Sequence, residues 1–113
     1  MRDMGSKLLS RAEEIVLLAV RQLQDNAYGV TIRGLISEAT GHRWSIGAVY
    51  APLYRLERKG LVRAIPGEST PARGGRSKIY YTVTPEGQKA LLRIRRVHDI
   101  LWAETKPTAV DET

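Results

Sequence analysis

The apolar pattern of this 113-residue chain changes its period once, at Gly60. Before Gly60, apolar residues recur at the 3.6-residue spacing that is typical of helices. After it come two segments rich in β-branched and aromatic residues, LVRAI (61–65) and SKIYYTV (77–83), which predict strands. The stretch between them, PGESTPARGG, is too long for a tight two-residue hairpin turn. We therefore expect helices first, and then two strands joined by a long loop.

Two helices are predicted before residue 42. The S-x-x-E pattern of Ser10 and Glu13 indicates a capping box that starts the first helix. Its apolar face is formed by Ala12, Ile15, Val16, Ala19, Val20 and Leu23. A turn at residues 25–29 separates it from a second helix, which runs from about Val30 to a C-terminal Gly41. The apolar positions of the second helix are Ile32, Leu35, Ile36 and Ala39.

The third helix contains a proline inside its apolar stripe. Ser45 is a good N-cap, and Ile46, Val49, Leu53 and Leu56 recur at helical spacing on both sides of Pro52. If Pro52 began a separate helix, Ala51 would be its N-cap, and alanine is among the poorer caps. We therefore expect one helix that bends at Pro52. The lost hydrogen bond and the ring clash at a proline cost about 3 kcal/mol in a helix interior, and a bend relieves part of this.

A long final helix is predicted from Thr84 as N-cap and Pro85 as N1 to about Glu104. The body before it is too small to cover its apolar stripe, so we expect a partner on this helix, most simply a second copy. The expected interface residues are Leu91, Ile94, Val97, Leu101 and Trp102. The predicted fold is mainly α with a small β-hairpin: a winged helix-turn-helix domain (1–84), followed by a C-terminal dimerisation helix and a frayed tail (85–113).

Charge is concentrated in the second half of the chain. The whole sequence has 18 Lys and Arg against 12 Asp and Glu, whereas residues 43–96 contain 12 basic and 3 acidic side chains. This asymmetry indicates a polyanionic partner, although a merely soluble basic surface explains it equally well. The lack of cysteines excludes disulfides and thiolate chemistry. No stretch approaches the roughly 20 apolar residues of a membrane span, so we expect a cytoplasmic protein.

Three segments together resemble the PadR family of bacterial transcriptional regulators. They are YG (28–29), GAVYAPLYRLERKGLV (47–62) and GGRSKIYYTVTPEG (74–87), in the same order and with compatible spacing. The resemblance implies that the front of the third helix enters the DNA major groove. It also implies the compact branch of the family, which has one dimerisation helix. In some members, aromatic residues on this helix stack planar ligands inside the dimer, so a small planar aromatic effector is a possible partner.

The resemblance and the positions of small, polar and basic residues give a candidate DNA-binding set. It comprises Ser45, Gly47, Ala48, Tyr50, Ala51 and Arg55 from the third helix, and Arg73, Arg76 and Lys78 from the hairpin. Each prediction has a structural alternative. Tyr50 could pack against the strands, and Arg55 could be an ordinary solvated helix arginine. For Trp102, dimer packing is favoured over ligand stacking.

No catalytic, metal or cofactor site is predicted. GESTP (67–71) lacks the final glycine and the strand-turn-helix context of a nucleophile elbow. The two histidines, His42 and His98, are far apart in sequence and have no nearby acidic residues at metal-ligand spacing. We therefore expect a ligand-responsive homodimeric repressor that binds a pseudo-palindromic double-stranded DNA site. The alternative is a winged-helix module that binds an acidic protein.

Overall fold

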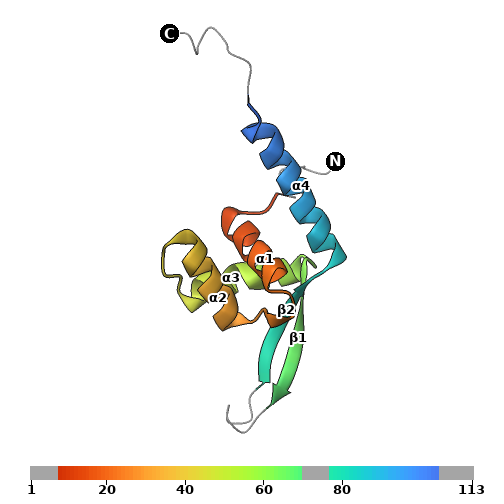
Figure 1. The fold of residues 1–113 in the computed structure, drawn as a ribbon. Helices are drawn as coiled ribbons and strands as arrows, with labels where there is room; N and C mark the ends of the chain where they lie inside the picture. Colours follow the sequence, from red (N-terminus) through yellow and green to blue (C-terminus); the bar gives the residue numbers. More distant parts are fainter. Residues whose placement is uncertain (1–7, 70–76, 105–113) are drawn as a thin grey trace.

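The computed structural model describes residues 8–69 and 77–104 of the chain. Three helices, α1 (Arg11–Leu23), α2 (Gly29–Thr40) and α3 (Ile46–Arg58), form the body, with the short 3-10 helix η2 (Gln24–Asn26) between the first two. The hairpin of β1 (Val62–Ser69) and β2 (Ser77–Val83) extends from one end of this body (Figure 1). Helix α4 (Pro85–Trp102) projects from the opposite end. The predicted fold class is confirmed.

The predicted helix caps are present in the structure. Ser10 Oγ accepts from the backbone N–H of Glu13, and the Glu13 carboxylate accepts from the backbone N–H of Ser10. At the start of α4, Thr84 Oγ1 accepts from the backbone N–H of Gly87 at 3.0 Å. Gly41 ends α2 with a φ of 74°, the left-handed conformation that favours glycine. Local sequence therefore sets where these helices begin and end.

Helix α3 is continuous across Pro52, as the spacing of its apolar residues predicts. Ser45 is its N-cap and accepts a hydrogen bond from the backbone N–H of Ala48 at 3.0 Å. Val49, Pro52, Leu53 and Leu56 are buried, so the proline ring is part of the core. Packing of this ring and its neighbours offsets the hydrogen bond that a proline cannot make. The bend at Pro52 stays a prediction.

The hairpin is antiparallel, and its register pairs Val62 with Val83, Ala64 with Tyr81 and Ile65 with Tyr80. Strand β1 extends past the predicted segment through Pro66 to Ser69, with an irregular register after Pro66. A proline is tolerated there because an edge strand need not use every N–H. Tyr81 N–H donates to the carbonyl of Ala27 at 2.8 Å, which fixes the hairpin to the turn before α2.

One hydrophobic core joins all these elements. Helix α1 contributes Val16, Leu17 and Val20, and these pack with residues of α2, α3 and the hairpin. Leu91 attaches the start of α4 to the same core. A Cβ at Gly87 would collide with the carbonyl of Leu61, so glycine lets α4 approach the hairpin closely. No helix in the described ranges is long and apolar enough to cross a membrane.

Candidate nucleic-acid interface

The side of α3 that faces away from the core is exposed and carries few long side chains in its front half. Gly47, Ala51, Tyr54 and Arg58 are exposed and recur at i, i+4, i+7 and i+11, which places them on one face. We call these four residues the outer stripe of α3. Ser45 and Ala48 are exposed beside its front end. The small front residues would let the helix backbone come close to another molecule.

Tyr50 is half-buried and belongs in part to the interior. Its hydroxyl lies against Gly29 at the start of α2, where an added Cβ would collide with it. Its ring stacks on that of Tyr54, with centroids 5.6 Å apart and planes at 26°. Tyr50 therefore packs chiefly against α2 and its own helix. Its contact with DNA stays a prediction.

Arg55 is held by an acidic residue of α1. Its Nε lies 2.9 Å from Oε2 of Glu13, and Lys59 Nζ lies 3.0 Å from the same carboxylate. Burial acts to raise the pKa of Glu13, but the Ser10 N–H, Lys59 and Arg55 together outweigh it and lower the pKa. Arg55 is therefore neither a free solvated side chain nor part of the outer stripe. Its contact with DNA stays a prediction.

The described part of the hairpin presents one of its three predicted basic residues. Lys78 Nζ lies 4.1 Å from the ring centroid of Tyr28, a cation–π contact, and this ring meets Tyr80 edge to face. Arg73 and Arg76 lie outside the described residues. On the other face of β2, burial and the nearby Tyr50, Tyr54 and Glu57 raise the pKa of Tyr81 to about 12. Tyr81 is buried in the hydrophobic core, so the hairpin face that bears it is the one turned toward the helices.

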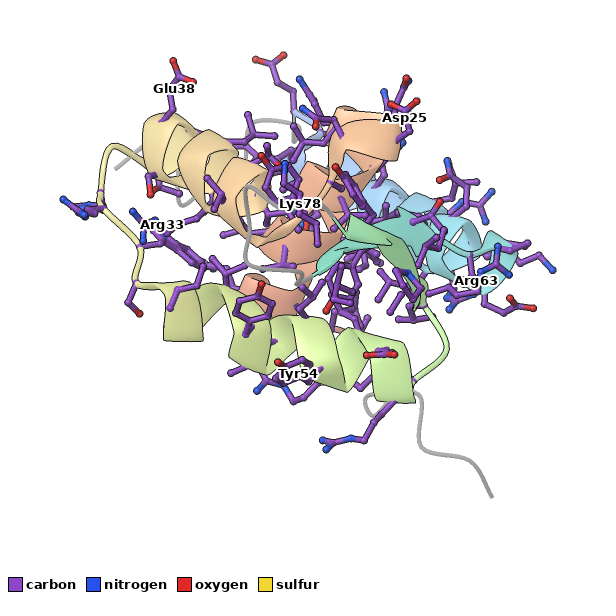
Figure 2. The ribbon with its side chains drawn as sticks, turned by 90° about the horizontal axis from the view of Figure 1, so that it is seen from below. Asp25, Arg33, Glu38, Tyr54, Arg63 and Lys78 are labelled. Carbon is purple, nitrogen blue, oxygen red and sulfur yellow. The ribbon has the colours of Figure 1, made fainter. Side chains whose placement is uncertain are left out.

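Sequence reasoning missed two residues of the outer stripe, Tyr54 and Arg58. Their signal was available, because they continue the i, i+4, i+7 series that begins at Gly47 and Ala51. Figure 2 shows Tyr54 on α3, with the labelled acids Asp25 and Glu38 on the opposite side of the molecule in this view. No acidic residue occurs in α3 before Glu57. The front of the helix is thus suited to approach a polyanion.

The expected interface residues of α4 fall into two groups. Leu91 and Ile94 are buried against the subunit's own body, so they offer little surface to a partner. Val97, Leu101 and Trp102 are 41%, 76% and 82% exposed, and Leu92 and Ile100 are also exposed. The free apolar surface therefore lies mainly in the last two turns of α4. His98 Nε2, 3.1 Å from Glu14 Oε2, ties this part of the helix to α1.

Within the described ranges, no group of three or more His, Asp or Glu side chains is placed to hold a metal ion. The structure packs α3 against β1 of the hairpin. Arg58 is exposed on the outer stripe of α3, whereas Lys78 lies on the hairpin face that bears Tyr80. A third helix followed by a two-stranded wing, on a helix-turn-helix body, defines a winged-helix protein of the DNA-binding class.

The chain belongs to the transcriptional regulator PadR-like family, whose profile matches residues 16–93. A PadR-like transcription factor from Bacteroides fragilis is similar in structure, with a TM-score of 0.68, 26% identity, and coverage of 79% of this chain and 81% of that one. A transcriptional regulator from Clostridium thermocellum gives a TM-score of 0.65 at 25% identity, covering 80% and 82%. A PadR family regulator from Eggerthella lenta gives a TM-score of 0.63 at 25% identity, and the match covers 77% of this chain and 73% of that one. Comparison with curated proteins gives no significant match.

Proposed function

We propose that the protein is a homodimeric, sequence-specific DNA-binding repressor, in which each subunit places α3 in the major groove of one half-site. The observation that carries this proposal is the exposed outer stripe of α3. The side chains at the front of this stripe are small, and α3 has no acidic residue before Glu57. An α-helix fits the major groove, and small front residues allow close approach to base edges. The hairpin then lies beside the neighbouring phosphate backbone.

Base reading by the front turn would be limited. Gly47, Ala48 and Ala51 offer at most methyl contacts, and Ser45 uses its Oγ to cap the helix. Part of the sequence preference would therefore come from DNA shape and deformability. Most of the affinity would come from phosphate neutralisation, so binding should weaken steeply as salt increases.

The homodimer is supported by the free end of α4. Val97, Leu101 and Trp102 form an apolar surface at the end of the helix, and such a surface is stabilised when another chain covers it. A twofold interface presents the same surface from both subunits. The two α3 helices would then read a pseudo-palindrome with half-sites about one helical turn apart.

The effector would be a small planar aromatic molecule held next to Trp102. Trp102 is 82% exposed in the subunit, so it is available both to the second copy and to a ligand between the copies. A ligand that favours one dimer geometry would change the separation of the α3 helices and release DNA. In this scheme residues 1–84 bind DNA and residues 85–113 set the dimer.

The test is a DNA-binding titration at several salt concentrations, with genomic DNA from upstream of the protein's own gene and a random duplex of equal length. We expect tighter binding to the upstream DNA and a steep salt dependence for both. Equal affinity for the two duplexes would overturn the specific regulator. Failure to bind either would favour the alternative, a winged-helix module for an acidic protein.

A further inference from the structure

Tyr54 occupies a distinctive place on the outer stripe of α3. It is 52% exposed, although it lies in the middle of a helix whose opposite face forms the core. It follows Gly47 by two turns, or about 10 Å along the helix axis. A side chain this far back lies behind the front turn that would read bases.

The Tyr54 ring is held in place rather than free. It stacks on Tyr50, and the Tyr50 hydroxyl in turn packs against Gly29 of α2. An aromatic side chain that is already ordered loses little conformational entropy on binding. The half-exposed Tyr54 side chain is therefore ordered before binding, so that ordering it on DNA costs little free energy.

The direction of Tyr54 follows from its neighbours. The Tyr54 ring stacks on that of Tyr50, and the Tyr50 hydroxyl lies against Gly29 of α2, so the Tyr54 ring lies on the Tyr50 side of α3. Tyr54 therefore lies at the edge of the outer stripe that is nearer to Tyr50. If α3 occupies the major groove, the DNA backbone beside that groove passes along this side of the helix.

We propose that Tyr54 donates its hydroxyl hydrogen to a phosphate oxygen of this backbone. The inference rests on the proposed function and adds a residue that positions α3 in the groove. A tyrosine hydroxyl is a common donor to phosphate, and such a contact contains no sequence information. Because the side chain is neutral, the contact releases no condensed counterion. Arg58, four residues further along the outer stripe, provides a charged contact to the same backbone.

The experiment compares Tyr54→Phe, Arg58→Gln and the wild-type chain on the upstream and random duplexes at several salt concentrations. Tyr54→Phe keeps the ring and its stacking on Tyr50 but removes the donor. We expect Tyr54→Phe to bind both duplexes about tenfold more weakly. The ratio of the two affinities and the slope of log affinity against log salt concentration should not change. Arg58→Gln should weaken binding to both duplexes and reduce the magnitude of the slope of log affinity against log salt concentration by about one.

The matched control is Tyr80→Phe. Tyr80 is adjacent to Tyr81 in β2 and therefore on the other hairpin face, where its ring meets Tyr28. This variant should bind as the wild type does, and thermal unfolding should verify that all three variants remain folded. Unchanged binding by Tyr54→Phe overturns the proposal, as does a loss that occurs on the upstream duplex alone, which would indicate a base contact. If the wild type fails to bind DNA, the proposed function fails as well.

Discussion

The guanidinium Nε of Arg55 in α3 lies 2.9 Å from the carboxylate Oε2 of Glu13 in α1, 42 residues earlier in the chain. Glu13 is only 3% exposed. The same carboxylate accepts from Lys59 and from the backbone N–H of Ser10. One acidic side chain thus caps α1 and fastens the rear half of α3 to it. The adjacent Glu14 contacts His98 of α4. The first turn of α1 is therefore the place where α3 and α4 are both attached to α1.

Glu13→Gln should reduce stability at neutral pH. The amide can still accept a hydrogen bond, but it leaves Arg55 and Lys59 without their counter-charge. Because both cations are 41% exposed, the loss should be about 2 kcal/mol rather than that of a fully buried pair. Urea unfolding at a fixed protein concentration measures it, with the exposed Glu38→Gln as control.

The same pair of proteins gives a pH test. The pKa of Glu13 is lowered on folding, so its ionisation stabilises the fold above its ordinary value of 4.5. This contribution is lost as pH falls from 4.5 through the folded-state pKa. The difference in unfolding free energy between wild type and Glu13→Gln should therefore shrink below pH 4.5. A difference that stays constant down to pH 3 would contradict the assigned role of the charge.

Arg55→Gln should act on stability and not on DNA charge contacts. We expect a loss of about 1 kcal/mol in unfolding free energy, because one of two partly exposed partners of Glu13 is removed. The slope of log affinity against log salt should stay at its wild-type value, in contrast to Arg58→Gln. A slope reduced by about one in Arg55→Gln would show that Arg55 leaves Glu13 to contact phosphate.

The two groups of apolar residues on α4 should respond differently to a charge. Leu101→Glu places the charge on a side chain that is 76% exposed, so the subunit should stay folded while the dimer dissociates. Loss of the second half-site contact should then weaken DNA binding about a hundredfold or more. Leu91→Glu buries the charge in the core and should unfold the chain. Sedimentation and circular dichroism distinguish the outcomes, and unchanged dimers of Leu101→Glu would place the interface elsewhere.

Gly29→Ala should disturb the tyrosine pair through a steric clash. The new Cβ would collide with the Tyr50 hydroxyl, and the ring must shift together with the stacked Tyr54. We expect a destabilisation of about 1 kcal/mol that is largely suppressed in Gly29→Ala/Tyr50→Ala, measured as a double-mutant cycle. Gly34→Ala on the same helix is the control, because its Cβ would meet no atom within 4 Å. That variant should be neutral or up to about 1 kcal/mol more stable. Additive effects of Gly29 and Tyr50 would rule out the clash.

Local sequence patterns were sufficient to predict the helices, their caps and the hairpin. Ser10, Ser45 and Thr84 cap helices because each side chain bonds a backbone N–H three residues away, which is a local interaction. The apolar stripe kept its phase across Pro52, so the continuity of α3 could be predicted from spacing alone. The order of elements then indicated the winged helix and, with the motifs of residues 47–62 and 74–87, the family.

Side chains whose partners are distant in sequence could be placed only from the packing of the separate elements. Spacing predicted that Arg55 lies on the outward side of α3. In the structure its Nε donates to the carboxylate of Glu13, which lies 42 residues earlier in the chain. Leu91 and Leu101 belong to one apolar stripe, yet only the first is covered, because the body ends partway along α4. Periodicity defines which residues share a face, whereas packing of separate elements defines what that face meets. That is also why Tyr54, and not Tyr50, emerged as the exposed tyrosine of α3.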